Sequence, residues 1–360
     1  MIKININLQE RSYPIYVTTD FNSISKCMTA LKSDGKVAVI TDTNVEKFYL
    51  QPCMDILRDA GYETYSYVIK SGEENKNLDT VRDIYRFLVE YKFDRRSTLI
   101  ALGGGVTGDI TGFVAATFLR GVNFVQIPTT LLAQADSSVG GKTGVDFDGY
   151  KNMVGAFYQP RFVYINVNTL KTLPERQLRS GLAEVVKHGI IANSEFYEFI
   201  DYNVNKIIRL DEDVLQYMAK ANCSIKGKVV EQDEKESGLR AILNFGHTIG
   251  HAIESVSGFS LFHGECVSVG MVGAFKIAEQ LGMVDESLTE RVKQTLQKIG
   301  LPVEVSGLNV RDVYNKMFHD KKVRQGKLLF VLPKKIGEVM QCFVDDESII
   351  MGTLREIIKE

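Results

Sequence analysis

The chain lacks the features that mark several large classes of protein. It has no run of about 18 apolar residues, so we expect no membrane-spanning helix. Its net charge of −2 excludes the basic excess typical of nucleic-acid-binding proteins. Residues 1–8 alternate apolar and polar side chains like a strand, unlike a signal peptide. Internal repeats and low-complexity linkers are also missing. These absences predict a soluble, cytoplasmic protein.

Cysteine is scarce and offers no obvious crosslinks. The five cysteines are at positions 27, 53, 223, 266 and 342. Their number is odd, they are scattered, and none forms a C-x-x-C pair. This pattern predicts buried, reduced thiols in place of a disulfide framework or a zinc ribbon.

The 360 residues are enough for two domains, and 44% hydrophobic with 24% charged residues is an ordinary globular composition. The first half alternates strands with helices, which is typical of a largely parallel sheet. The expected strands are 36–42, 64–69, 97–102, 123–127 and 162–167. The expected helices are 45–58, interrupted at Pro52, and 78–91, with Val81, Ile84 and Leu88 on one face.

From about Pro174 the apolar spacing becomes helical. The expected helices are 176–191, 211–232, 244–257, 264–281 and 286–299, followed by a hairpin of 327–332 with 338–344 and a last helix. We therefore predict an α/β, Rossmann-like nucleotide-binding domain over 1–174 and a mostly α-helical domain over 175–360. Ligands are expected in the cleft between the two domains.

A glycine-rich turn follows the strand at 97–102. Gly103, Gly105 and Gly108 have the G-x-G-x-x-G spacing and open a helix, whose free N–H groups suit a pyrophosphate. The next strand ends without the acidic residue that usually binds the ribose, and Asp42 is a candidate for that role. The spacing alone is equally compatible with a tight strand–helix junction.

A second glycine-rich stretch, Ser137–Thr143, resembles a P-loop but has Asp136 in place of its first glycine. Lys142 in this stretch is therefore either a point charge on a ligand or a solvated lysine.

The second half contains candidate metal ligands. His247 and His251 are four residues apart on an expected helix, and Glu184 and His188 share that spacing. His263 lies at a turn before a long apolar helix. One carboxylate with imidazoles is the ligand set of a catalytic metal site with an open position. Local pattern alone does not rank these candidates, and a lone helical histidine is more often simply packed or solvated.

Basic residues accompany these motifs. If they converge on one cleft, they form an acceptor for phosphate and carboxylate groups, whereas on separate helix faces they are solvated. They are Lys187, Lys226, Arg240, Lys321 and Lys322. His319, among Asp320, Lys321 and Lys322, is expected to be exposed.

Together these residues make the chain resemble the 3-dehydroquinate synthase family of sugar-phosphate cyclases over nearly its whole length. Many ordered matches carry this resemblance. They are the stretches 71–76, 103–109, 128–130, 135–146, 151–152, 181–187, 238–240, 243–251, 263–265 and 320–322.

The resemblance implies a lyase of the shikimate pathway that depends on NAD and a divalent metal. It implies conversion of 3-deoxy-D-arabino-heptulosonate 7-phosphate to 3-dehydroquinate and phosphate. The reaction would run through transient oxidation by NAD, phosphate elimination, re-reduction and intramolecular aldol closure.

The resemblance also assigns residues to the two cofactors. It implies zinc or cobalt on Glu184, His247 and His263, which leaves His251 for substrate contact or proton transfer. It places NAD along residues at strand ends and in loops of the first half. These are Asp42, Ser71, Gly72, Glu73, Lys76, Gly104, Gly105, Val106, Thr107, Gly108, Asp109, Thr129, Thr130, Lys142, Lys151, Thr169, Leu170, Lys171 and Thr172.

Polar residues from both halves are implied to hold the substrate. They are Asp136, Lys142, Asn152, Lys187, Lys226, Arg240, Asn244, His251 and one lysine of the Lys321/Lys322 pair, here taken as Lys321. Arg120 resembles an arginine that reaches the substrate phosphate from the other subunit of a homodimer.

Three alternatives remain. Another sugar-phosphate cyclase, such as 2-deoxy-scyllo-inosose synthase, would use glucose 6-phosphate, which lacks the carboxylate that Arg240 suits. A metal-dependent polyol dehydrogenase of the glycerol dehydrogenase type would need no phosphate-binding lysines and would release NADH. A non-catalytic NAD-binding protein would have no use for the metal ligands and the basic residues.

Overall fold

The computed structural model describes residues 1–31, 35–236, 238–318, 323–324 and 327–359. The chain forms two compact units: Met1–Leu173 with Glu212–Glu231, and Pro174–Asp211 with Gln232–Glu360. The segment Glu212–Glu231, which the sequence analysis placed in the second domain, thus packs with the first unit. No helix within the described ranges is long and apolar enough to cross a membrane.

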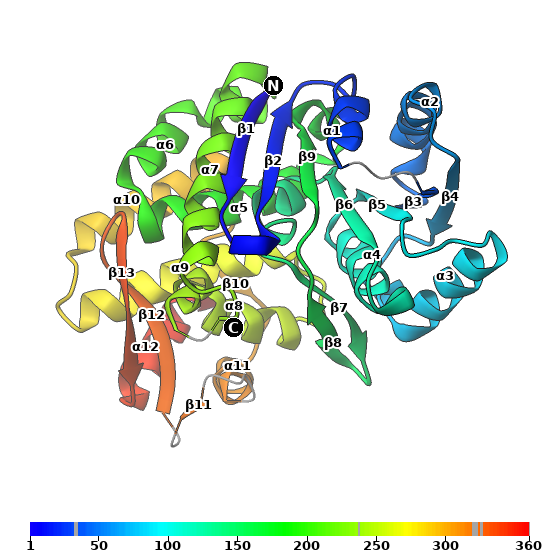
Figure 1. The fold of residues 1–360 in the computed structure, drawn as a ribbon. Helices are drawn as coiled ribbons and strands as arrows, with labels where there is room; N and C mark the ends of the chain where they lie inside the picture. The colour runs from blue at the N-terminus through cyan, green and yellow to red at the C-terminus, as the bar shows by residue number, and fades with distance from the viewer. Residues whose placement is uncertain (32–34, 237, 319–322, 325–326, 360) are drawn as a thin grey trace. The chain divides into compact units, whose positions relative to one another are not determined.

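The first unit is built on a seven-stranded sheet with the order β1-β2-β9-β6-β5-β3-β4 (Figure 1). Its strands are β1 (Ile2–Ile6), β2 (Tyr13–Thr18), β3 (Val37–Asp42), β4 (Thr64–Ile69), β5 (Thr98–Gly103), β6 (Asn123–Pro128) and β9 (Phe162–Asn166). Strand β1 pairs antiparallel with β2, and all other neighbours are parallel. The carboxyl ends of β3, β4, β5 and β6 therefore meet at one edge, which confirms the predicted α/β class.

Both faces of this sheet are covered, because successive strand residues point to opposite sides. In β3, Val37 and Val39 belong to a core cluster with residues of α1 (Ile24–Ala30) and α2 (Gln51–Asp59). Ala38 and Ile40 belong to a second cluster, with residues of α3 (Leu78–Glu90) and α4 (Gly105–Thr117). A short π-helical turn, Glu46–Leu50, leads into α2, where Pro52 stands in the first turn as the predicted break requires.

Two further elements complete the first unit. The hairpin of β7 (Lys142–Phe147) and β8 (Tyr150–Phe157) is a separate two-stranded sheet (Figure 1). The sequence analysis missed it, since β8 is mostly exposed and carries no clear alternation. Helix α7 (Glu212–Gln232) packs with this unit. Its Asn222 amide donates to the carbonyl oxygen of Ala135, in the segment after β6, at 2.6 Å.

The second unit is mostly helical, as predicted. Its helices are α5 (Glu175–Ala192), α6 (Ser194–Ile208), α8 (His247–Val256), α9 (His263–Gln280), α10 (Glu286–Ile299), α11 (Val310–Met317) and α12 (Glu347–Ile357). Its strands are β10 (Val305–Ser306), β11 (Val323–Arg324), β12 (Lys327–Lys335), β13 (Glu338–Val344) and β14 (Ile358–Lys359). The predicted β12–β13 hairpin and the last helix are present, and α6 and α11 are additional.

Glycines allow three helices of the second unit to approach closely. A Cβ atom at Gly264, in the first turn of α9, would lie 1.9 Å from the Ser180 carbonyl oxygen of α5. A Cβ atom at Gly270 would lie 1.9 Å from the Gly246 carbonyl oxygen, directly before α8. No side chain fits at these two contacts, so the backbones of α5, α8 and α9 meet at van der Waals distance.

Candidate metal centre and nucleotide site

Helices α5, α8 and α9 bring Glu184, His247 and His263 together. One ligand atom from each lies within 4.8 Å of the others. The Glu184 Oε1 atom is 3.5 Å from His247 Nε2 and 3.4 Å from His263 Nε2. This oxygen is buried and accepts no hydrogen bond from the described residues. Two imidazole nitrogens and an unsatisfied carboxylate oxygen facing one point fit a divalent cation with an open position.

The charge around Glu184 suits metal binding. Burial by itself would raise the pKa of its carboxyl group, but the Lys187 ammonium and the two imidazoles hold that pKa well below its usual range. Burial and the nearby Lys187 charge lower the pKa of His247 well below its ordinary value. His247 is therefore neutral and its ring nitrogen is available as a ligand.

His263 behaves differently. Burial would lower its pKa, but the neighbouring Glu184 and Glu254 carboxylates raise it to about 9. The metal-free protein thus stabilises a proton on this ring, and a bound cation would replace that proton.

The other two histidine candidates have different positions. His251 lies on α8, and its ring centroid is 5.0 Å from that of His247 and 5.9 Å from that of His263. It shares a second possible ligand group with Glu254 and His263. His188 is fully buried on α5 and belongs with Glu184 to a further possible ligand group, but it is not a member of the set formed by Glu184, His247 and His263.

The glycine turn lies at the carboxyl edge of the sheet in the first unit. Helix α4 begins at Gly105, directly after β5, so its first N–H groups have no partner within the helix. A Cβ atom at Gly108 would lie 2.9 Å from Gln126 Oε1 on β6, so this third glycine allows the helix to pack against the sheet. The motif is thus a strand–turn–helix junction of the type that binds pyrophosphate.

Several predicted nucleotide-binding residues meet around this turn. The Thr107 hydroxyl donates to Asp42 Oδ2 at 3.1 Å, and the buried Lys76 ammonium is 2.6 Å from Asp109 Oδ2. Lys76 also donates to Asn152 Oδ1 on β8, which was predicted to contact substrate. The Thr129 hydroxyl, at the end of β6, is buried and has no hydrogen-bond partner in the described part of the chain.

The remaining predicted nucleotide-binding residues have varied surroundings. The Ser71 hydroxyl is 3.0 Å from that of Thr43, and Thr169 accepts a hydrogen bond from Gln134 at 3.0 Å. Lys171 forms an ion pair with Glu212 at 2.9 Å. Lys142 and Lys151 are exposed on the β7–β8 hairpin. Thr169 and Lys171 therefore already contribute to packing within the first unit.

The predicted substrate residues are divided between the units. In the first unit, Lys226 of α7 is 2.8 Å from Asp136 Oδ1. In the second unit, Lys187 pairs with Glu184, and the buried Arg240 guanidinium donates to the Glu234 carbonyl oxygen. The Asn244 amide donates to Glu236 Oε1 at 3.2 Å.

Lys321, Lys322 and His319 lie outside the described residues.

The sequence analysis missed one member of the metal-site surroundings. The Glu254 carboxylate is 3.3 Å from His263 Nδ1. Its spacing from His247 and His251, at i+7 and i+3, puts all three on one face of α8, and this spacing could have identified it.

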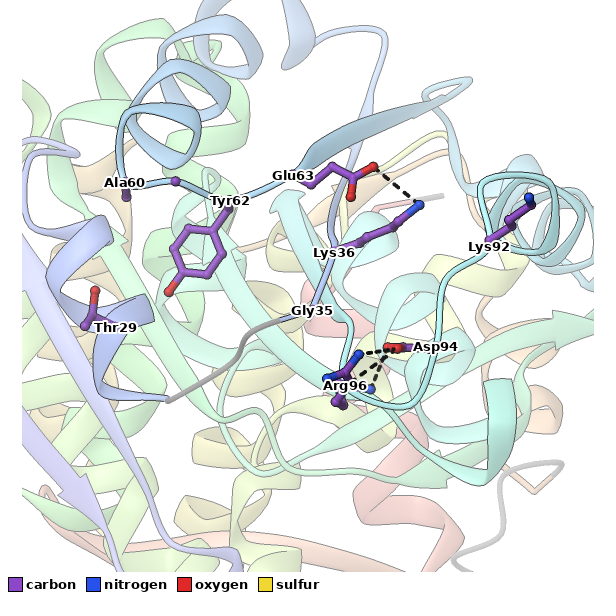
Figure 2. Close-up of a pocket in the computed structure, with 10 residues that line it drawn as sticks. Thr29, Gly35, Lys36, Ala60, Tyr62, Glu63, Lys92, Asp94 and Arg96 are labelled. Carbon is purple, nitrogen blue, oxygen red and sulfur yellow. Dashed lines mark hydrogen bonds and ion pairs between the residues drawn. The ribbon is translucent and has the colours of Figure 1, made fainter.

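The first unit also contains a pocket at the opposite, amino edge of the sheet. Its volume is about 520 Å³, and its charged groups include Lys36, Glu63, Asp94 and Arg96 (Figure 2). Lys36 is 3.4 Å from Glu63 and Arg96 is 3.3 Å from Asp94, so these charges pair within the pocket. It is lined by none of the residues predicted to bind NAD or substrate.

Comparison with solved structures supports this fold. A 2-deoxy-scyllo-inosose synthase, solved with carbaglucose-6-phosphate, NAD⁺ and Co²⁺, matches with a TM-score of 0.91, 26% identity and coverage of 99% of this chain and 100% of that one. The 2-epi-5-epi-valiolone synthase from Streptomyces hygroscopicus, solved with NAD⁺ and Zn²⁺, matches with a TM-score of 0.88 and 25% identity over 98% of both chains. A glycerol dehydrogenase from Schizosaccharomyces pombe shares only the fold, with a TM-score of 0.67 and 15% identity over 95% of this chain and 88% of that one.

Sequence comparison is more specific. A curated 3-dehydroquinate synthase from Acetivibrio thermocellus is 67% identical over 99% of both chains, and one from Ruminiclostridium cellulolyticum is 58% identical over 99% of both. Residues 66–180 match the family model of the 3-dehydroquinate synthase N-terminal region, and residues 181–323 match that of its C-terminal region. The chain therefore belongs to the 3-dehydroquinate synthase family.

Proposed function

We propose that this chain converts 3-deoxy-D-arabino-heptulosonate 7-phosphate to 3-dehydroquinate and phosphate, with NAD and one divalent metal as cofactors. The observation that carries the proposal is the convergence of His247 Nε2 and His263 Nε2 on the unsatisfied Glu184 Oε1 atom, in a chain 67% identical to a curated enzyme of this name. We further propose that residues 1–174, with the segment Glu212–Glu231 that packs with them, form the NAD-binding part and that the rest of residues 175–360 forms the metal-binding part.

When bound, NAD supplies a hydride acceptor and the metal a Lewis acid. We assign zinc or cobalt to Glu184, His247 and His263, since relatives of similar fold were solved with Co²⁺ or Zn²⁺ and NAD⁺. Burial keeps His247 neutral and therefore able to offer Nε2. The Lys187 ammonium, paired with Glu184, adds positive charge beside the cluster, where it can stabilise developing negative charge on the substrate.

For NAD, the glycine turn offers the free N–H groups of the first turn of α4 to the pyrophosphate. The Thr129 hydroxyl offers a buried polar group without a protein partner. Lys76 and Asp109 form a buried ion pair next to the turn, which orients both side chains. The other residues predicted from the family resemblance complete this proposed site.

For the substrate, we propose the lysines and Arg240 as holders of phosphate and carboxylate. Asp136 fixes the ammonium of Lys226 in the first unit, and the Glu234 carbonyl oxygen fixes the Arg240 guanidinium in the second. His251, next to both metal-ligating rings, is the proposed proton-transfer group.

A homodimer is also proposed. The β7–β8 hairpin exposes the apolar side chains of Phe147, Tyr150, Met153 and Phe157. Arg120 is exposed and has a left-handed backbone with φ of 67°, a conformation that is uncommon for non-glycine residues. A second copy of the chain would cover this apolar surface.

The catalytic proposal is tested by phosphate release from 3-deoxy-D-arabino-heptulosonate 7-phosphate. Chelator-treated protein receives NAD and zinc together and singly, while absorbance monitors NADH. Release that needs both cofactors, without accumulation of NADH, is expected. Release from glucose 6-phosphate instead would make the chain an inosose-type cyclase, and NADH accumulation on simple polyols would make it a dehydrogenase.

The dimer proposal is tested by light scattering and by mixing two inactive variants. Arg120→Ala subunits lack the arginine, and His263→Ala subunits lack a metal ligand. If Arg120 acts on the partner site, a mixed dimer has one complete site and regains activity. A monomeric protein, or a mixture without regained activity, contradicts the proposal.

A further inference from the structure

The two proposed histidine ligands present the same ring nitrogen to Glu184. His247 Nε2 is 3.5 Å and His263 Nε2 is 3.4 Å from Glu184 Oε1. An imidazole binds a metal through one nitrogen only, and the hydrogen bond of the other nitrogen decides which one is free. The partner of each Nδ1 atom therefore determines whether the ring is ready for a metal.

These two Nδ1 partners differ in kind. His247 Nδ1 is 3.0 Å from the backbone carbonyl oxygen of Phe245. His263 Nδ1 is 3.3 Å from the Glu254 carboxylate, a side chain on the neighbouring helix α8. The first acceptor is part of the main chain, whereas the second depends on one side chain. His263 is also the more exposed ring, at 28% against 11% for His247, so it has less packing to orient it.

Glu254 is well suited to hold this ring. It lies seven residues after His247 on α8, so both side chains are on the same face of the helix as His251. Glu254 is 8% exposed, and a carboxylate with so little access to water needs a hydrogen-bond donor. An N–H on His263 Nδ1 provides one.

We propose that Glu254 is a positioning residue for the metal centre. It accepts a hydrogen bond from His263 Nδ1 and so holds the ring with Nε2 directed at the metal position. The inference rests on the ligand set in the proposed function. It differs from the second possible group, His251, Glu254 and His263, in which Glu254 would itself bind the cation.

The test measures metal affinity without substrate. Chelator-treated parent protein and the variants Glu254→Ala and Glu254→Gln are titrated with zinc against a chromophoric chelator. Loss of such an orienting partner lowers metal affinity by about 10- to 100-fold, which is the decrease expected for Glu254→Ala. Glu254→Gln retains an oxygen that accepts from Nδ1, so a smaller decrease is expected. Affinity equal to the parent in Glu254→Ala would overturn the proposal.

Nitrogen-15 NMR of the histidine rings in the zinc-loaded parent distinguishes the two roles of Glu254. Binding through Nε2 of His263, with the proton on Nδ1, is expected. Binding through Nδ1 would overturn the proposal.

Glu279→Ala is the matched control for folding. It removes a partly buried carboxylate on α9, the helix that carries His263, and should bind zinc like the parent.

Two further variants separate this inference from the proposed function. His247→Ala and His263→Ala are titrated in the same way. If both lose zinc and Glu254→Ala does not, the positioning role alone fails. If both retain zinc, the ligand assignment itself fails.

Discussion

The proposed nucleotide turn and the candidate metal centre are built in opposite ways. The turn at Gly103–Gly108 offers backbone N–H groups, and its members are neighbours in the sequence. The metal centre is made of side chains, and Glu184 and His263 are distant along the chain but face each other because α5 and α9 touch at Gly264. A backbone site is therefore visible as a local motif, whereas a side-chain site depends on how helices pack.

The two sites also use a buried lysine–carboxylate pair differently. Lys76 pairs with Asp109, yet burial and the nearby Glu73 and Asp146 leave the pKa of Asp109 raised. Lys187 pairs with Glu184, and with two imidazoles added, the pKa of Glu184 is lowered although burial opposes it. Local charge balance, and not the ion pair alone, determines the direction in which the pKa of each carboxyl group is shifted.

The largest effect is expected for the proposed metal ligands. In His247→Ala or His263→Ala, one of the two converging nitrogens is lost, so stoichiometric metal and nearly all activity should disappear. Metal analysis of the purified variants measures this. Full metal occupancy in either variant would contradict the side-chain site described here.

A large effect is also expected at the helix contact. In Gly264→Ala, the new Cβ would meet the Ser180 carbonyl oxygen at 1.9 Å, so α9 must shift away from α5. Such overpacking costs about 1–3 kcal/mol of the free energy of unfolding, and zinc affinity should decrease with it. Denaturant unfolding and zinc titration measure both. Gly352→Ala on α12 meets no atom closer than 4.0 Å and is the control. Unchanged zinc affinity in Gly264→Ala would show that the contact does not build the site.

An intermediate effect is expected for Arg240→Ala. A hydrogen bond to a charged group is worth about 1.5–3 kcal/mol, so kcat/KM should decrease by about 10- to 100-fold. NAD affinity should be unchanged, because Arg240 is assigned to the substrate carboxylate, a group that NAD lacks. Steady-state kinetics and NAD titration compare the two effects, with circular dichroism to verify folding of the variant. Equal losses in both would mean that Arg240 is misassigned.

The smallest effect concerns stability at acidic pH in chelator-treated protein. Because the pKa of Glu184 is lowered in the folded state, the unfolded chain binds more protons than the folded chain at pH values below the ordinary pKa of 4.5. The contribution of the ionised Glu184 carboxylate to stability is therefore lost on acidification. The raised pKa of Asp109 has the opposite sign, because above its ordinary value of 3.8 the folded state binds more protons.

The two carboxylates should therefore respond oppositely to neutralisation. Glu184→Gln should flatten the decrease of unfolding free energy as the pH falls below about 4.5, and Asp109→Asn should steepen the decrease as the pH approaches 3.8 from above. Urea unfolding at a series of pH values measures both slopes. The same change of slope in both variants would contradict the charge balance described for the two sites.

Much of the fold could be predicted from local pattern. The strand at 64–69 and the helix at 286–299 agree with β4 and α10, because alternation and helical spacing are local properties of a strand and an amphipathic helix. The β7–β8 hairpin was missed because β8 is mostly exposed and carries no clear alternation, although Val145 of β7 belongs to the core and Val154 of β8 packs against it.

The sequence by itself determined the elements, the glycine turn and the inventory of residues able to bind a metal. Local pattern left open which residues of that inventory meet; the family resemblance named Glu184, His247 and His263, and the tertiary structure brings these three together. It placed His247 Nε2 and His263 Nε2 around Glu184 Oε1, and it added Glu254 beside His263 Nδ1. The physical reason is that helical spacing specifies which face a side chain occupies, whereas the close backbone contacts at Gly264 and Gly270 specify which faces of α5, α8 and α9 come together.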